Sequence, residues 1–438
     1  MNYLYLLLIT EIVFLLIHMA ATKLDFTSPG FVTLALFILS TVCVIWNEDY
    51  WDVEFHPLTY WLVTAGLAVA IGVELIIKLL FQIQKRRVWI DQQKFIEFKG
   101  YQISVPVQFV SAILFTGMMV VYIVAIVRAG GSDDLLTNIG VVHNDVEIEV
   151  GTLPTICIRI LRLEAFVYLY FFVCNVFICR QRFAQNALLL VPVLAAWTAI
   201  FFSGVRSTFV YYFLAVIFYA IMLRRFKKGW HTVKLRKYIK YIVIFGGAFV
   251  LLFIATRTII KNHEFKSTGL EYITFYLGSP LHLLNKILED TTQAFPTHYN
   301  DILGAHTFRL FYQELFKFGL MDTKVEETYF VAVGGGYYGG GNVYTIFGPP
   351  FHDFGFAGTM VYTAIFYGVF DFIYYKCFRY GIRIARSHSV LIVYGAYYYL
   401  VLMSYYGTLT AQLKLQTLLE MAVIVILYKY IPRIKIRS

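Results

Sequence analysis

The chain has 438 residues, of which 59% are hydrophobic and 15% are charged, and its mean hydropathy is +0.67. Soluble domains carry about 25% charged residues, so this composition excludes a soluble globular protein and indicates an integral membrane protein. The net charge of +10 follows from the membrane topology described below, and nucleic acid is not needed as a partner to explain it.

Eleven apolar runs are long enough to cross a hydrocarbon core about 30 Å thick, which takes about 17 to 25 helical residues. Strand-type alternation of polar and apolar residues is absent from them. The sequence therefore predicts an all-α, polytopic bundle of about 11 transmembrane helices and disfavours a barrel. In chain order the predicted spans are 3–19, 30–46, 58–82, 104–128, 154–179, 185–202, 208–223, 241–259, 346–373, 388–406 and 415–431.

The connections between these spans differ in charge. Acidic residues but no Lys or Arg occur in 47–57 and 129–153. Basic residues stay on the cytoplasmic side, so the N-terminus is expected outside and the C-terminus in the cytoplasm. The first run lacks a basic start and is expected to be a retained helix, not a cleaved signal. The basic segments are 83–100, 180–183, 224–240, 376–387 and 429–438.

The longest connection lies on the outer side and divides the chain. We expect an N-terminal transmembrane bundle (1–260), an extracytoplasmic loop module (261–345) and C-terminal transmembrane helices (346–438). Within the loop, Ser279 before Pro280 predicts the start of a helix. A second helix is predicted over 306–318, ending at Gly319. Both are expected to lie over the outer mouth of the bundle.

The loop ends in a stretch, 333–358, that is rich in Gly, Tyr and Phe. Glycine allows a backbone to approach a ligand closely, and irregular backbone at membrane depth must face protein or a water-filled cavity. A ligand-lining segment is one interpretation. A flexible tether with a belt of Tyr at the level of the lipid headgroups is the alternative.

Several arginines occur at the outer ends of predicted spans. Arg159 and Arg162 share one helix face, and a guanidinium matches phosphate oxygens. They could instead pair with Glu164 or reach the lipid headgroups. Arg206 lies in a tight turn and Arg257 at the end of a span. Together with Arg309 on the loop helix, the five arginines are predicted to hold one anionic group at the outer surface, although each alone suits an interface anchor.

His352 and Asp353 follow Pro349-Pro350 at the start of the ninth predicted span. A His and a carboxylate beside a polar cavity can exchange a proton with a sugar hydroxyl. The alternative for Asp353 is a cap of its own helix, stabilised by the helix dipole. No HExxH, GxSxG or Walker loop occurs in the sequence, so proteolysis, acyl transfer and ATP hydrolysis have no support.

Two segments resemble the O-antigen polymerases (Wzy-type), enzymes that join lipid-linked oligosaccharide repeat units. SGVRSTFVYYFLA (203–215) is similar to that family's Ser-Gly-x-Arg turn, and NVYTIFGPPFHDFGFAG (342–358) is similar to its Asn-x-Tyr…Asp-Phe-Gly segment. Val205 departs from the small residue common there. The resemblance implies a GT-C-like fold at the outer face of the bacterial inner membrane. It also implies an undecaprenyl pyrophosphate-linked donor and acceptor, no cofactor and no metal, and a partner protein that regulates chain length.

The resemblance carries over Arg206 and Asp353. The other roles are predictions from residue chemistry. Arg159, Arg162, Arg257 and Arg309 would join Arg206 on the pyrophosphate, and His352, Asp353 or Glu327 would be the base. Sugar contacts are predicted for Tyr329, Tyr337, Tyr338, Asn342 and Tyr344. An O-antigen ligase and a lipid-linked oligosaccharide flippase remain the alternatives, although the expected repeats of a transporter are not found.

Overall fold

A computed structural model describes residues 2–84, 100–131, 138–139, 150–205, 207–228, 230, 247, 269–299, 301–334, 340–380 and 384–433. The chain divides into two compact units. Unit 1 comprises Met1–Arg87, Phe265–Tyr380 and Leu400–Thr417, and unit 2 comprises Val88–Glu264, Gly381–Tyr399 and Leu418–Ser438. Unit 1 thus draws on all three segments into which the sequence was divided.

Among the described residues, eight helices are long and apolar enough to cross a membrane. The chain is therefore an all-α, polytopic membrane protein. These helices coincide with eight of the eleven predicted spans. Their bounds are Tyr3–Thr22, Pro29–Trp46, Pro57–Ile83, Val105–Gly130, Phe183–Phe202, Thr208–Lys228, Gly348–Arg379 and Leu415–Arg433.

Two other predicted spans are helical but are not among these eight. The span at 154–179 is helical, as α8 (Thr152–Phe172) and the π-helix η2 (Val173–Ile178), and it contains three charged residues, Arg159, Arg162 and Glu164. The span at 388–406 breaks into α17 (Ile384–Tyr397), α18 (Tyr399–Leu402) and the 3-10 turn η8 (Met403–Tyr405). At about 1.5 Å per residue, α17 alone is shorter than a span, so a crossing here would need α18 and η8 as well. The predicted span 241–259 lies outside the described residues except for Gly247.

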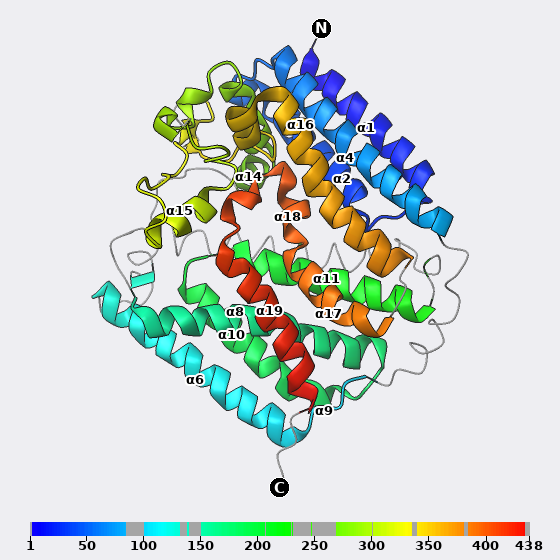
Figure 1. Cartoon of the computed structure of the whole chain (residues 1–438), viewed down its shortest axis with the longest axis vertical. Coiled ribbons are helices and arrows are strands. Elements are labelled where there is room, and N and C mark those ends of the chain that lie inside the picture. Colours follow the sequence, from blue (N-terminus) through cyan, green and yellow to red (C-terminus); the bar gives the residue numbers. More distant parts are fainter. Residues whose placement is uncertain are drawn as a thin grey trace. The chain divides into compact units, whose positions relative to one another are not determined.

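Unit 1 is built around α16 (Gly348–Ile373), which packs along α4 (Pro57–Gln84) (Figure 1). The Ser28 hydroxyl caps α2, where Pro29 fits the first turn. The other elements assigned to this unit are α1 (Tyr3–Thr22), α2 (Pro29–Trp46), α3 (Glu48–Trp51), α14 (Gly269–Ile287), η5 (Thr291–Gln293), η6 (Thr297–Tyr299), α15 (Arg309–Lys317), β1 (Val331–Ala332), β2 (Gly340–Gly341), the π-helix η7 (Tyr374–Arg379), η8 (Met403–Tyr405) and η9 (Leu409–Gln412).

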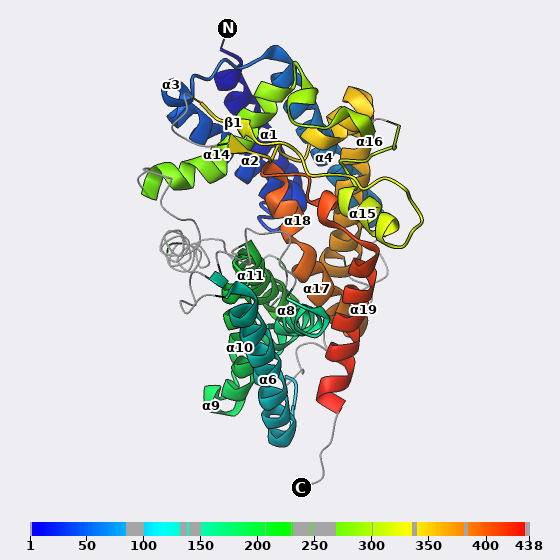
Figure 2. The same ribbon diagram turned by 90° about the vertical axis from the view of Figure 1, so that its left-hand side faces the viewer.

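Unit 2 contains a group of three helices, α6 (Val105–Gly130), α8 and α10 (Leu190–Phe202), that pack against one another (Figure 2). Further helices α11 (Ser207–Lys228) and α17 also pack together. The short elements are α9 (Phe183–Asn186) and η3 (Ala187–Leu189). The C-terminal α19 (Leu415–Tyr430) begins in unit 1 and continues in unit 2, and η10 (Ile431–Arg433) follows it.

The helices of the long loop are partly as predicted. The second one, α15, ends before Gly319, whose φ of +68° terminates it as expected. The predicted start at Pro280 is wrong, because α14 begins at Gly269 and runs through that proline. Proline inside a helix costs about 3 kcal/mol. Packing offsets this, since α14 lies against α2 and a Cβ on Gly278 would come within 3.0 Å of Cys43.

The stability of unit 1 is expected to fall in acid because of His282 on α14. The His282 Nε2–H donates to the Val333 carbonyl at 2.7 Å, and burial lowers the pKa of this imidazole to about 4. The unfolded chain therefore takes up this proton near pH 6.5 and the folded chain only near pH 4. The neutral His282 therefore stabilises the folded state by up to about 3 kcal/mol. This stabilisation is fully present above about pH 6.5 and is lost as the pH falls towards 4.

Thermal unfolding of the purified protein between pH 7.5 and 4.5 measures this effect. His282→Gln keeps a donor for Val333 but cannot titrate, so its Tm should fall less with pH than that of the wild type. The exposed His298 supplies the control His298→Gln. Identical pH profiles for the wild type and His282→Gln would contradict the assignment.

Candidate functional site

His352 and Asp353 lie in the first part of α16, before a kink at Gly355, where φ is +67° and ψ is −170°. Both side chains are half-buried. The capping interpretation of Asp353 is wrong, because the first turn of α16 contains no acidic residue. Asp353 instead accepts hydrogen bonds from a distant loop. Its Oδ2 receives the Thr307 N–H at 2.7 Å and the Thr307 hydroxyl at 2.6 Å.

A second histidine, His306, lies beside His352 and Asp353 and forms a cluster with them. The sequence patterns did not point to this residue. His306 is 2% exposed, and its ring centroid lies 5.1 Å from that of His352. One ligand atom each of His306, His352 and Asp353 lies within 4.8 Å of the other two. Burial lowers the pKa of His306 to about 4. In the sequence, the one hint that His306 belongs to the cluster is the adjacent pair of polar residues His306-Thr307 just before α15.

The loop that carries His306 has a small core of its own. Tyr299, Ala305 and Val325 are buried together, and Tyr312 of α15 packs against them. Gly304 adopts a φ of +73°, which lets the chain turn just before His306. The position of His306 therefore follows from packing within the loop.

Aromatic packing and one hydroxyl hold the ring of His352. Phe295 stacks on it with the ring centroids 4.8 Å apart, and the Thr291 Oγ1 lies 2.8 Å from the His352 Nδ1. Phe295 also lies 5.1 Å from the ring of His306. Both imidazoles are thus fixed by the segment between α14 and α15.

Glu327 and Arg309, predicted as a base and a pyrophosphate ligand, form an ion pair. The Arg309 Nη1 lies 2.9 Å from the Glu327 Oε1, and the side chains are 17% and 71% exposed. Exposed pairs of this kind contribute at most about 1 kcal/mol. Of the three predicted bases, the structure therefore brings together His352 and Asp353, while Glu327 neutralises Arg309.

The residues predicted to contact sugar have different surroundings. Tyr344 is 1% exposed and its hydroxyl donates to the Tyr329 carbonyl at 2.6 Å, so its ring faces are covered by protein. The Tyr329 side chain is exposed and that of Asn342 is half-buried. Tyr337 and Tyr338 lie outside the described residues. Only Tyr329 and Asn342 are described with side-chain surface available to a ligand.

The described glycines of this stretch are closely packed. A Cβ on Gly334 would come within 3.0 Å of the Trp51 Cα, and one on Gly341 would overlap Leu283. Gly340 and Gly341 form β2, which pairs antiparallel with β1. This close packing disfavours a flexible tether for the described part of the segment.

The remaining predicted arginines belong to unit 2. Arg159 is exposed and Arg162 is half-buried. Neither carboxylate oxygen of the buried Glu164 has a hydrogen-bond partner among the described residues, so the alternative of an internal ion pair with these arginines is wrong. Arg206 and Arg257 lie outside the described residues. Convergence of the five arginines on one anion stays a prediction.

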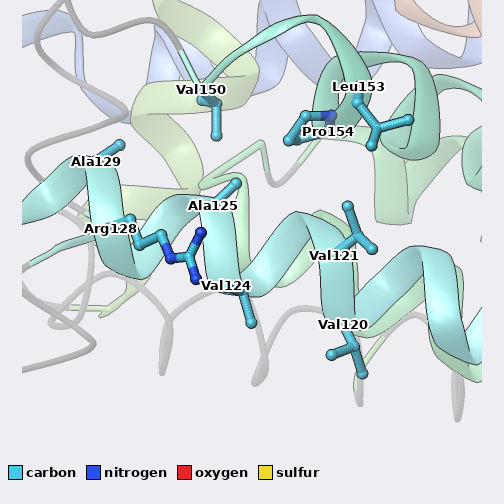
Figure 3. A pocket seen from close by; sticks show the side chains of 9 residues that line it. All are labelled: Val120, Val121, Val124, Ala125, Arg128, Ala129, Val150, Leu153 and Pro154. Atoms are coloured by element: carbon cyan, nitrogen blue, oxygen red, sulfur yellow. The ribbon is translucent and has the colours of Figure 1, made fainter.

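Unit 2 also has an open groove of about 620 Å³ between α6 and the start of α8 (Figure 3). Its wall is apolar apart from Arg128, whose guanidinium Figure 3 shows beside Ala125. A smaller pocket of about 390 Å³ is lined by Arg180, Arg224, Lys227 and Lys228, with Phe177 and Ile178. Neither contains a residue of the His306–His352–Asp353 cluster.

Comparison with known proteins identifies no relative of this chain. No family model matches it, and neither do the curated proteins or the solved structures.

Proposed function

We propose that this protein is a membrane glycosyltransferase that polymerises undecaprenyl pyrophosphate-linked oligosaccharide repeat units, as the O-antigen polymerases do. The observation that carries the proposal is the placement of His352 and Asp353. They lie together in a half-buried cluster at the start of α16, within the segment 342–358 that resembles that family. The polytopic, apolar architecture suits a substrate anchored in the bilayer.

The cluster suits removal of a proton from a sugar hydroxyl. In the proposed reaction the acceptor oxygen attacks the anomeric carbon of the donor sugar, and the bond from that carbon to the pyrophosphate oxygen breaks. The hydroxyl proton passes to His352 or Asp353, and lipid pyrophosphate leaves. A positioned base of this kind contributes about 10² to 10⁴-fold to the rate.

Arginines would stabilise the charge that develops on the leaving pyrophosphate. Arg206, carried over by the resemblance, is the first candidate, with Arg159, Arg162 and Arg257 as further ones. Arg309 is available because its partner Glu327 is highly exposed and can swing into water at a cost of at most about 1 kcal/mol. Glu327 then acts as a counterion of Arg309 and not as the base.

The proposal includes the finer features that the resemblance implied. We place the protein in the bacterial inner membrane with a GT-C-like fold of about 11 spans, its N-terminus periplasmic and its C-terminus cytoplasmic. Tyr329, Tyr337, Tyr338 and Asn342 would contact sugars. Tyr344 is left out because its ring is covered.

Deletion of the gene is expected to leave surface core bearing a single repeat unit, and wild-type protein should restore the ladder of longer chains on a gel. Arg206→Ala, expressed at the wild-type level, should fail to restore it. Accumulation of free lipid-linked polymer in the deletion strain would instead indicate a ligase. Accumulation of unpolymerised units on the cytoplasmic face would indicate a flippase, and an unchanged ladder would refute all three.

A further inference from the structure

The hydrogen bonds of the cluster leave one ligand atom free on each of its three residues. His306 Nε2 lies 3.3 Å from the Pro296 carbonyl, which can only accept, so Nε2 carries the hydrogen. The His306 Nδ1 therefore bears a lone pair, and it is buried with no hydrogen-bond partner among the described residues. Leaving such an acceptor unsatisfied costs about 1 to 3 kcal/mol. A bound cation would remove this cost.

The other two residues show the same division of roles. The His352 Nδ1 lies 2.8 Å from the Thr291 Oγ1. When Nδ1–H donates to this hydroxyl, Nε2 bears the lone pair that a cation needs. The Asp353 Oδ2 accepts both hydrogen bonds from Thr307, while the one contact of Oδ1 among the described residues is a long one, 3.4 Å from the His306 N–H. Metal-binding histidines are usually oriented in this way, with the second ring nitrogen bonded to a carbonyl or another polar group.

We propose that His306, His352 and Asp353 bind one divalent cation of the zinc class. Their ligand atoms lie within 4.8 Å of one another, and two imidazoles with one carboxylate suit Zn²⁺ and its neighbours better than Mg²⁺ or Ca²⁺. Tetrahedral ligands on bonds of about 2.1 Å are closer together than this, so binding draws the side chains inward.

Three protein ligands leave a coordination position open. Catalytic zinc sites have this composition, whereas structural sites are closed by four protein ligands. A water or hydroxyl bound at the open position loses its proton more easily. In terms of the proposed function, which would then depart from the metal-free reaction that the resemblance implies, the acceptor hydroxyl would occupy this position and lose its proton to solvent water. His352 and Asp353 would then act as ligands of the cation and not as the base. The binding site itself does not depend on that function.

Metal binding can be measured directly on the full-length protein in detergent, purified with a tag that contains no histidine. Apoprotein titrated with Co²⁺ should develop visible absorption bands at one equivalent, and Zn²⁺ should abolish them by displacement. Co²⁺ binding should weaken by about 100-fold or more in each of the variants His306→Ala, His352→Ala and Asp353→Ala. Loss of an outer partner, a residue that hydrogen-bonds a ligand without touching the metal, typically costs about 10 to 100-fold. Thr291→Val, which removes such an outer partner, should weaken it by about 10-fold.

His298→Ala is the matched control, since His298 is an exposed histidine of the same segment, and it should bind Co²⁺ as the wild type does. The proposal is overturned if the wild-type protein shows no Co²⁺ bands, or if the three ligand variants and Thr291→Val bind Co²⁺ like the wild type. Because the wild type and Thr291→Val are decisive by themselves, misfolding of a ligand variant does not obscure the result.

The outcome separates this inference from the proposed function. Stoichiometric Co²⁺ binding in a protein whose deletion leaves the polysaccharide ladder unchanged would support the metal site and refute the polymerase. A ladder that depends on His352 and Asp353 in a protein that binds no Co²⁺ or Zn²⁺ would do the reverse.

Discussion

Asp353→Asn is expected to lower the rate of polymer formation by about 10² to 10⁴-fold, the range for loss of a positioned acid or base. The substitution preserves the size of the side chain, and the amide oxygen can still accept a hydrogen bond from Thr307. It removes the negative charge of the cluster, and with it the capacity to take up a proton or, where the proposed cation is bound, the anionic ligand of that cation. The loss should therefore appear in the rate, with the fold intact.

The rate is measured as chain elongation in isolated membranes supplied with lipid-linked repeat units. Thr307→Val is the graded variant. It removes the hydroxyl that donates to Asp353 at 2.6 Å but keeps the backbone N–H, so it should cost about 10-fold, from roughly 1.5 kcal/mol for a hydrogen bond to a charged group. Asp301→Asn, at an exposed acid in the same loop, should be neutral. A wild-type rate in Asp353→Asn would remove the cluster from the mechanism.

Gly30→Ala is expected to destabilise unit 1 by about 3 kcal/mol, the lower end of the cost of disrupting a buried charged network. The Gly30 N–H donates to the Glu74 Oε2 at 2.7 Å, and a Cβ at this position would overlap that oxygen. The same carboxylate lies 3.0 Å from the His18 Nε2 and accepts the Tyr375 hydroxyl at 2.7 Å. Displacing Glu74 would therefore disturb three contacts between four segments of unit 1.

Thermal unfolding followed with a thiol-reactive dye suits this test, because the free thiol of Cys43 is buried on the same helix as Gly30. The midpoint should fall clearly in Gly30→Ala. Gly72→Ala is the matched control, since a Cβ on Gly72 of α4 meets no atom within 4 Å and Ala favours a helix by about 1 kcal/mol. If the unfolding midpoint of Gly30→Ala equals that of Gly72→Ala, the contacts of Glu74 do not require the close approach of the Gly30 backbone.

Glu74 also shows why local patterns mislead inside a bundle. Spacing of four residues suggests a pair with Lys78 on the same helix, whereas the structure directs Glu74 to His18, Gly30 and Tyr375, and Lys78 to the Ala21 carbonyl. Surface rules for helix pairs assume solvent around the side chains. In the interior the partner is whichever neighbouring helix presents a donor.

The sequence by itself determined the features that depend on local composition. Eight spans follow from the length and apolarity of each run, the end of α15 from Gly319, and the placing of His352 and Asp353 at the start of α16 from the prolines before them. These are properties of a few consecutive residues, because helix formation in a bilayer needs no partner segment.

Only the tertiary structure decided the features that depend on distant contacts. His306 joins the cluster from 46 positions before His352. Pro280 lies inside α14 because that helix packs on α2, and the Tyr344 side chain is buried by its neighbours. In each case the free energy comes from packing and hydrogen bonds between segments far apart in the chain, and it outweighs the local preference. His352 and Asp353 are predicted from the sequence one at a time, whereas folding alone brings His306 to them.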